Sequence, residues 1–285
     1  MTSSPQSNPT SDNPSVLAPT LSSSGRYSWY HPIFSPEHGV YVVLVVSFLT
    51  GVAAAQQWTL ASTLALISAF CGFQAEHPFV LQIKQRKSWK PRFLVWGSLY
   101  AVISLGIAGY LALQTPMVLW LCLGAIATFA IDAISVFYRQ QKSFANELLT
   151  FAAVCLTAPL AYMATTGMWT MSILGLWLLN TLFFSSAIFT VKLRKPRTAS
   201  RLPGSIYHGV ASVIIVGLWG LGWVSTVGAI AFSLAVVKFS VIGWQRDWYQ
   251  TTPIQNVAFV ETFSSLLFLS LTAVSLLPAH LPPAG

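Results

Sequence analysis

The chain has 285 residues, of which 54% are hydrophobic and 8% charged, with a formal net charge of +8 at pH 7 and a mean hydropathy of +0.64. Ordinary globular chains carry about 25% charged residues, so this composition excludes a water-soluble fold. Long uncharged apolar runs predict transmembrane helices, because about 20 residues span the hydrocarbon core of a bilayer. We therefore predict an all-α integral membrane protein.

The two ends of the chain differ in composition from its apolar middle. Residues 1–34 are rich in Ser, Thr, Pro and Asn, and such a segment buries too little apolar surface to offset the entropy lost on ordering. We expect a disordered polar tail there, a transmembrane domain over residues 35–278 and a short tail over residues 279–285. The amino-terminal tail lacks the basic start and apolar core of a secretory signal.

Apolar runs, and the polar or helix-breaking residues between them, divide the middle of the chain into nine candidate spans. The predicted spans are 39–56, 58–75, 94–113, 116–137, 146–165, 168–190, 205–224, 226–244 and 254–278. Several connections are very short, whereas the connections over 76–93 and 191–204 are long and basic.

The Lys and Arg residues fall in alternate connections of this nine-span arrangement. They lie in the amino-terminal tail and after the second, fourth, sixth and eighth spans, and of the 15 only Lys238 lies inside a span. Because cationic loops are retained in the cytoplasm, we predict a cytoplasmic amino terminus and a carboxyl terminus outside. The basic loops are expected to rest on anionic lipid of the bilayer. They require no nucleic-acid partner, and protein partners are not identified.

Ionisable side chains inside a bilayer cost about 2.5–3.5 kcal/mol each at the centre of a span, so each needs a reason to be there. In this chain they lie at the predicted cytoplasmic end of the spans or near the midplane. Asp132 lies near that end of the fourth span, and Glu76-His77 is placed at the exit of the second. From this distribution we predict a polar pocket that faces the cytoplasm. Its candidate residues are Glu37, His38, Glu147, Asn180, His208, Lys238 and Glu261.

Some of these residues have simpler interpretations. Lys238 and Glu261 lie on adjacent antiparallel spans within about one helical turn of each other in depth, so a structural ion pair is expected. Lys238 could instead extend towards the cytoplasmic surface. The pair Glu37-His38 could be solvated at the interface, and Glu147 could stabilise the start of its own helix.

The cysteines offer no chemistry of their own. Cys71, Cys122 and Cys155 all lie in apolar spans and lack the spacing of metal or redox motifs. No metal site and no cofactor is predicted, and no catalytic residue is identified.

Three stretches resemble the YwiC-like family of bacterial multi-pass membrane proteins. They read SPEHGVY (35–41), ANELLTFAAVCLTAPLAY (145–162) and WLLNTLFFSSAIFTVKLRK (177–195). A Pro-x-His-Gly start followed by an aromatic residue is typical of the family, and Pro36, His38, Gly39 and Tyr41 match it. The resemblance implies a bacterial inner-membrane location and no particular reaction. It points to His38, Glu147 and Asn180 as positions to test.

The span arrangement also resembles that of UbiA-type prenyltransferases, which have nine spans and cytoplasmic loops after the second and sixth over a central pocket. Those enzymes hold Mg²⁺ and a diphosphate with aspartate-rich motifs. Here the 191–204 loop has no acidic residue, and no aspartate lies between Asp12 and Asp132. Three function classes stay open: a carrier-like pocket for a small solute or amphiphile, a lipid-phase enzyme without Mg-diphosphate motifs, and a non-catalytic scaffold or assembly component.

Overall fold

A computed structural model of the protein describes residues 31–86, 88–195 and 200–277, and the regular secondary structure in those ranges is entirely helical. The predicted tails at 1–34 and 279–285 fall almost wholly outside the described residues. The helices are α1 His38–Ala55, α2 Leu60–Gln85, α3 Pro91–Gln114, α4 Val118–Phe137, α5 Phe144–Cys155, α6 Thr157–Thr166, α7 Met171–Leu193, α8 Leu202–Gly220, α9 Thr226–Trp244, α10 Arg246–Thr251 and α11 Ile254–Ser275.

Nine helical segments of the described residues are long and apolar enough to cross a membrane, with α5 and α6 together forming one of them. This confirms the predicted number of spans. The break between α5 and α6 falls at Leu156, three residues before Pro159. Proline cannot donate to the carbonyl four residues earlier, here that of Cys155, and its ring crowds that carbonyl.

The second helix extends beyond the predicted span of residues 58–75. Helix α2 continues for another ten residues to Gln85 and includes Pro78. Glu76 and His77 therefore lie inside a helix. Because Pro78 has no N–H to offer the Gln74 carbonyl, the sequence favours a break there, yet the helix passes through it.

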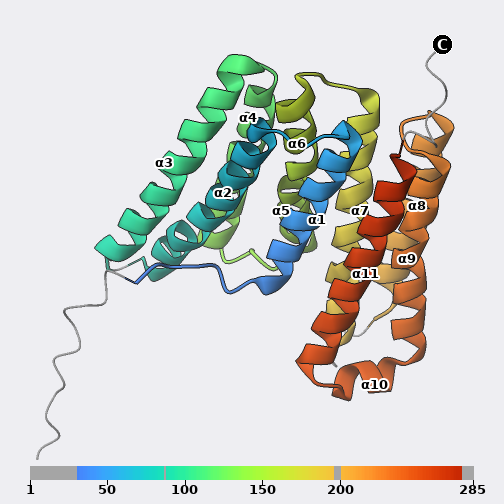
Figure 1. The fold of residues 1–285 in the computed structure, drawn as a ribbon. Helices are drawn as coiled ribbons and strands as arrows, with labels where there is room; N and C mark the ends of the chain where they lie inside the picture. Colours follow the sequence, from blue (N-terminus) through green and yellow to red (C-terminus); the bar gives the residue numbers. More distant parts are fainter. Residues whose placement is uncertain (1–30, 87, 196–199, 278–285) are drawn as a thin grey trace, which may run out of the picture. The chain divides into compact units, whose positions relative to one another are not determined.

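Helix α1 lies between two groups of helices (Figure 1). On one side are α2, α3 and α4, and on the other are α7, α8, α9 and α11, while α5 and α6 pack directly beside α1. Helix α1 approaches α6 closely at Gly51, where an added Cβ would overlap the carbonyl oxygen of Ala158. Small residues at such contacts let helix backbones pack closely in a membrane, where van der Waals contact drives association.

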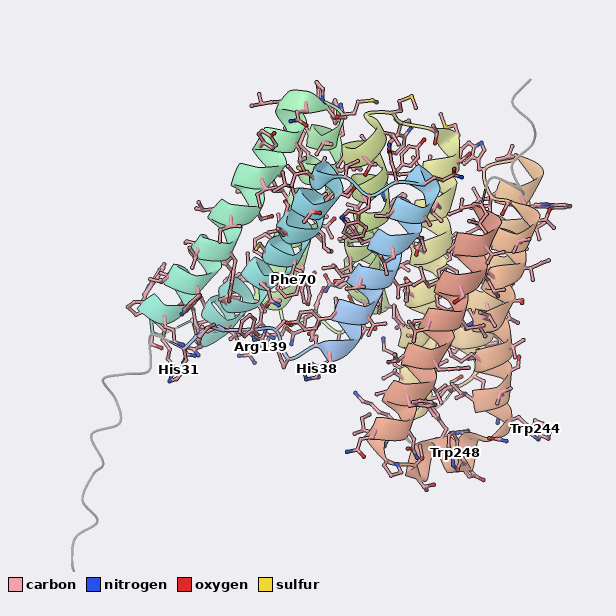
Figure 2. The ribbon with its side chains drawn as sticks, in the orientation of Figure 1. His31, His38, Phe70, Arg139, Trp244 and Trp248 are labelled. Carbon is pink, nitrogen blue, oxygen red and sulfur yellow. The ribbon has the colours of Figure 1, made fainter. Side chains whose placement is uncertain are left out.

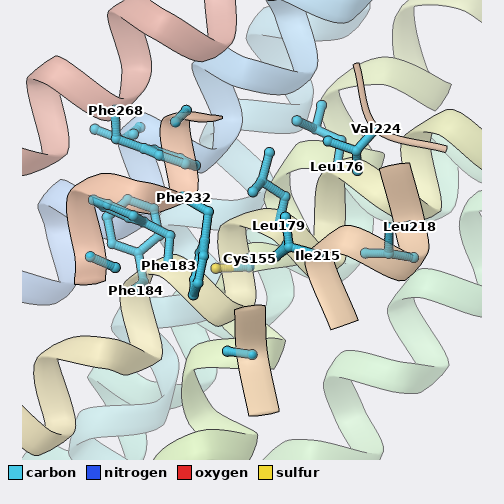
Figure 3. Packing of buried hydrophobic residues seen from close by; sticks show 14 of the residues in the cluster. Cys155, Leu176, Leu179, Phe183, Phe184, Ile215, Leu218, Val224, Phe232 and Phe268 are labelled. Atoms are coloured by element: carbon cyan, nitrogen blue, oxygen red, sulfur yellow. The ribbon is translucent and has the colours of Figure 1, made fainter. Parts of the chain in front are cut away.

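The largest cluster of buried apolar side chains lies around α7 (Figure 3). Phe183 of α7 stacks on Phe268 of α11 with their ring centroids 3.9 Å apart, and Phe184 meets Phe183 edge to face at 5.2 Å. Phe232 of α9 and Cys155 of α5 belong to the same cluster. This packing fixes α7, the most buried of the candidate spans, at the centre of its group.

The described cations other than Lys238 lie at or beside the lower ends of the helices in Figure 1, and we call this side of the molecule the basic end. They are Lys84, Arg86, Lys90, Arg92, Arg139, Lys142, Lys192, Arg194, Lys195, Arg201 and Arg246. Arg26, Lys87 and Arg197 lie outside the described residues. The cations of the alternate loops thus lie together on one side of the helices. That this side faces the cytoplasm stays a prediction.

Candidate functional site

The segment before α1 is held to α2 by a closed set of hydrogen bonds. The Ser35 N–H donates to Gln74 Oε1 at 3.0 Å, and Gln74 Nε2 donates to the Tyr41 hydroxyl at 2.5 Å. The Tyr41 hydroxyl in turn donates to the Ser35 carbonyl at 3.0 Å. The SPEHGVY stretch therefore has a local structural task, which is to fix the start of α1 against α2.

Glu37 and His38 lie within that stretch and are exposed at the basic end. His38 points away from the helices (Figure 2). Glu37 lies close enough to Glu76 of α2 for the two carboxyl groups to interact electrostatically. Glu37 is thus near an acidic group that lines a cavity, whereas His38 faces outward.

That cavity has a volume of about 420 Å³ and lies among α1 to α6. Apolar side chains form most of its wall, including Phe73, Phe79 and Phe129. Small hydroxyl side chains such as Ser68 and Ser104 interrupt the apolar surface. Sites for small molecules are commonly apolar cavities with a few placed polar groups, and this cavity has that character.

Glu76 and Asp132 supply the ionisable groups of the wall. Their carboxyl groups interact with each other, and Asp132 Oδ1 also accepts a hydrogen bond from Asn146 Nδ2 at 2.6 Å. Asn146 is positioned at the start of α5, where the Ser143 hydroxyl accepts its backbone N–H at 3.3 Å. In the described part of the chain no Lys or Arg lines this cavity. The acidic pair is therefore suited to accept hydrogen bonds or a positive charge.

We infer an opening of the cavity between α3 and α4 from lining residues that are also exposed. Leu105 of α3 and Ile126 of α4 both line it and remain 54% and 48% exposed. Ala125, next to Ile126, also lines it and is exposed. Since α3 and α4 are predicted spans, this opening faces the region that lipid chains would occupy.

Two of the predicted pocket residues tie neighbouring helices together elsewhere. Glu147 of α5 pairs with Lys192 of α7. Asn180 of α7 is fully buried; its Oδ1 accepts from the Ser47 hydroxyl at 3.3 Å, and its Nδ2 donates to the Thr50 hydroxyl at 3.0 Å. The Asn180 contacts join α7 to α1.

The remaining predicted residues gather among α7, α8, α9 and α11. Lys238 Nζ lies 2.7 Å from Glu261 Oε2, which confirms the expected ion pair. The Thr190 hydroxyl donates to Glu261 Oε1 at 3.1 Å. The buried His208 ring donates from Nδ1 to the Gly204 carbonyl at 2.7 Å and stacks on Phe239 at 4.3 Å.

Tyr249 of α10 lies near Glu261, on the side of this group towards the basic end. Burial, and secondly the nearby Glu261 carboxylate, raise the pKa of Tyr249 to about 12. The phenol therefore stays neutral at physiological pH and adds no charge to the Lys238–Glu261 pair.

The seven predicted residues thus lie at four places, and among the described residues none of them lines the larger cavity. Its acids, Glu76 and Asp132, were noticed in the sequence but were not chosen as pocket residues. The signal for Glu76 was the apolar run that follows Pro78, which indicates that the helix continues past residue 75.

Comparison with known proteins bears on the first half of the chain. Residues 34–162 match the family model described as YwiC-like protein. Two of the three resembling stretches, 35–41 and 145–162, fall within the match, whereas 177–195 lies outside it. No curated protein and no solved structure matches the chain. The matched residues 34–162, which include every residue of the larger cavity's wall, are thus similar to the YwiC-like family.

Proposed function

We propose that the protein binds an amphiphile from the membrane, with the apolar part in the larger cavity and the polar group beside Glu76 and Asp132. The observation that carries this proposal is the combination, in one cavity, of an apolar wall, an opening between α3 and α4 and two interacting carboxyl groups. A volume of about 420 Å³ suits a small lipid-soluble molecule. Such a protein is carrier-like rather than a pure scaffold.

The chemistry of the wall limits the polar group of the ligand. Carboxyl oxygens accept hydrogen bonds and attract cations, and the described wall provides no Lys or Arg to hold an anion. The ligand class is therefore an amphiphile with an ammonium or, less strongly held, a hydroxyl group. We further propose that the basic end faces the cytoplasm of a bacterial inner membrane, which puts Glu76 and Asp132 in the inner half of the bilayer.

The test uses three single-chain amphiphiles of equal length: an alkylamine, an alkyl alcohol and an alkyl sulfate. Each competes with a fluorescent alkylamine for the purified protein in an uncharged detergent. The alkylamine should bind most tightly and the alkyl sulfate least. Glu76→Gln and Asp132→Asn should each weaken alkylamine binding by about tenfold or more, because a hydrogen bond to a charged group contributes about 1.5–3 kcal/mol.

Two alanines of α4 provide a matched pair of variants. Ala125 is exposed and lines the cavity, and Ala127 is exposed on the same helix without lining it. Ala125→Phe should fill the opening and remove binding, whereas Ala127→Phe should leave it unchanged. Equal binding of the three amphiphiles, or equal behaviour of the two variants, would reject the proposal and favour the scaffold class.

A further inference from the structure

A second cavity, of about 320 Å³, lies at the basic end among α5, α7, α8 and α9. Its wall differs in kind from that of the first cavity. Lys142 and Lys192 contribute cations, Ser200 contributes a hydroxyl, and aromatic rings from Phe144, Phe189 and Phe239 form much of the remainder. In the described part of the chain no acidic residue lines it.

The two lysines differ in how they are held at the cavity wall. Lys192 pairs with Glu147 and lies 3.5 Å from the centroid of the Phe144 ring, so its position is fixed. Lys142 is exposed and makes no ion pair with a described residue. The described wall therefore carries two ammonium groups and no carboxylate, which favours an anion in the cavity.

Ser200 completes a set of donors around the cavity. Its hydroxyl oxygen accepts the backbone N–H of Leu202 at 3.3 Å, which fixes the side chain at the start of α8. No described residue accepts a hydrogen bond from this hydroxyl, so its hydrogen can donate to a bound group. Ring contacts hold the aromatic part of the wall in place. Phe144 stacks on Phe189 with centroids 5.4 Å apart, and Phe239 stacks on His208, which lies outside the wall.

We propose that this second cavity binds a phosphate group, which Lys142, Lys192 and Ser200 contact from different directions. Charged hydrogen bonds to several oxygens of one anion are among the stronger polar interactions in proteins. The phosphate could belong to the headgroup of an anionic phospholipid or to a soluble phosphate compound. The two cavities share no lining residue among those described, so this site is independent of the proposed amphiphile site.

The experiment uses the full chain in an uncharged detergent with three probes: a short-chain phosphatidylglycerol, the phosphatidylcholine of equal chain length and inorganic phosphate. Binding is measured by native mass spectrometry and by the shift in thermal unfolding temperature. Phosphatidylglycerol should bind more tightly than phosphatidylcholine. Lys142→Gln should weaken phosphatidylglycerol binding by about fivefold, as expected for one lysine beside an anionic lipid, and Ser200→Ala should weaken it as well.

Lys84→Gln is the matched control, because Lys84 is an exposed lysine of the basic end that does not line the cavity. It should leave phosphatidylglycerol binding unchanged. Equal losses in Lys84→Gln and Lys142→Gln would show general surface attraction and overturn the proposal, as would the absence of binding by both phosphatidylglycerol and inorganic phosphate. Competition by inorganic phosphate would identify a soluble source, and its failure to compete a lipid source. Alkylamine binding should be unchanged in Lys142→Gln, which separates this test from that of the larger cavity.

Discussion

Asn180 lies fully buried in the middle of α7, with hydrogen bonds that reach α1 and its own helix. Besides its contacts to Ser47 and Thr50, its Nδ2 donates to the Leu176 carbonyl at 2.8 Å. Hydrogen bonds between helices in a membrane contribute about 0.6–2 kcal/mol each, so these contacts give the residue a structural reason to be there. Its role as a site residue stays a prediction.

Lys238, which is buried, and Glu261, which is partly exposed, pair inside the membrane-spanning region, so removal of either partner leaves the other charge without its counter-ion. Breaking a buried pair commonly costs about 3–5 kcal/mol. Lys238→Met and Glu261→Gln should each lower the free energy of unfolding in detergent by about that amount. The double variant should recover part of the loss, because it strands no charge.

A double-mutant cycle of thermal or denaturant melts measures this coupling. Thr190 offers an internal control, since its hydroxyl also contacts Glu261 and carries no charge. Thr190→Val should cost less than either charge removal. Strictly additive losses for Lys238→Met and Glu261→Gln would contradict a coupled pair.

At the scale of the elements, α1 organises the bundle because it contacts helices of both groups. It packs against α6, α5 and α2 on one side and against α7 and α11 on the other. One close contact among these is that of Gly51 with the Ala158 carbonyl of α6. A carbonyl in a helix backbone cannot turn aside, so the two helices must separate if a side chain is added there.

Gly51→Ala should therefore destabilise the protein by about 1–3 kcal/mol, as overpacking of a tight contact does. Gly106 of α3 is the matched control, because an added Cβ there meets no atom within 4 Å. Gly106→Ala should be neutral or stabilising by up to about 1 kcal/mol, since alanine favours a helix over glycine. Thermal melts in the same detergent would show the difference, and equal melting temperatures for the two variants would contradict the close contact.

For the whole molecule, the number and order of spans follow from the sequence because each span depends on about 20 neighbouring residues. The Lys238–Glu261 pair also follows, since consecutive spans must run antiparallel. The Glu147–Lys192 pair lies on consecutive spans too, but Lys192 was assigned to the loop after residue 190, whereas α7 continues to Leu193. Because the predicted span ended three residues before the end of α7, this pair was not predicted.

The larger cavity is beyond such local reasoning. Its acids come from α2 and α4, and Asp132 is held by Asn146 of α5. Which of several polar side chains meet across three helices depends on the rotation and crossing of those helices, and neither is encoded in hydropathy. Hydropathy averages over the faces of a helix, so a carboxyl that faces a cavity and one that faces lipid give the same signal.

The orientation of the molecule can be tested from its charge. Cationic residues resist translocation, and the described cations other than Lys238 lie at one end of the helices. Trp244 and Trp248 are exposed at the same end, as expected where a membrane meets water.

In a bacterial host, a reporter active only outside the inner membrane should give signal when fused after Gly285. Fused after Lys195 it should give none, and a reporter that folds only in the cytoplasm should show the opposite pattern. If the signals are exchanged, the basic end lies outside, and Glu76, Asp132 and the second cavity lie in the outer half of the bilayer.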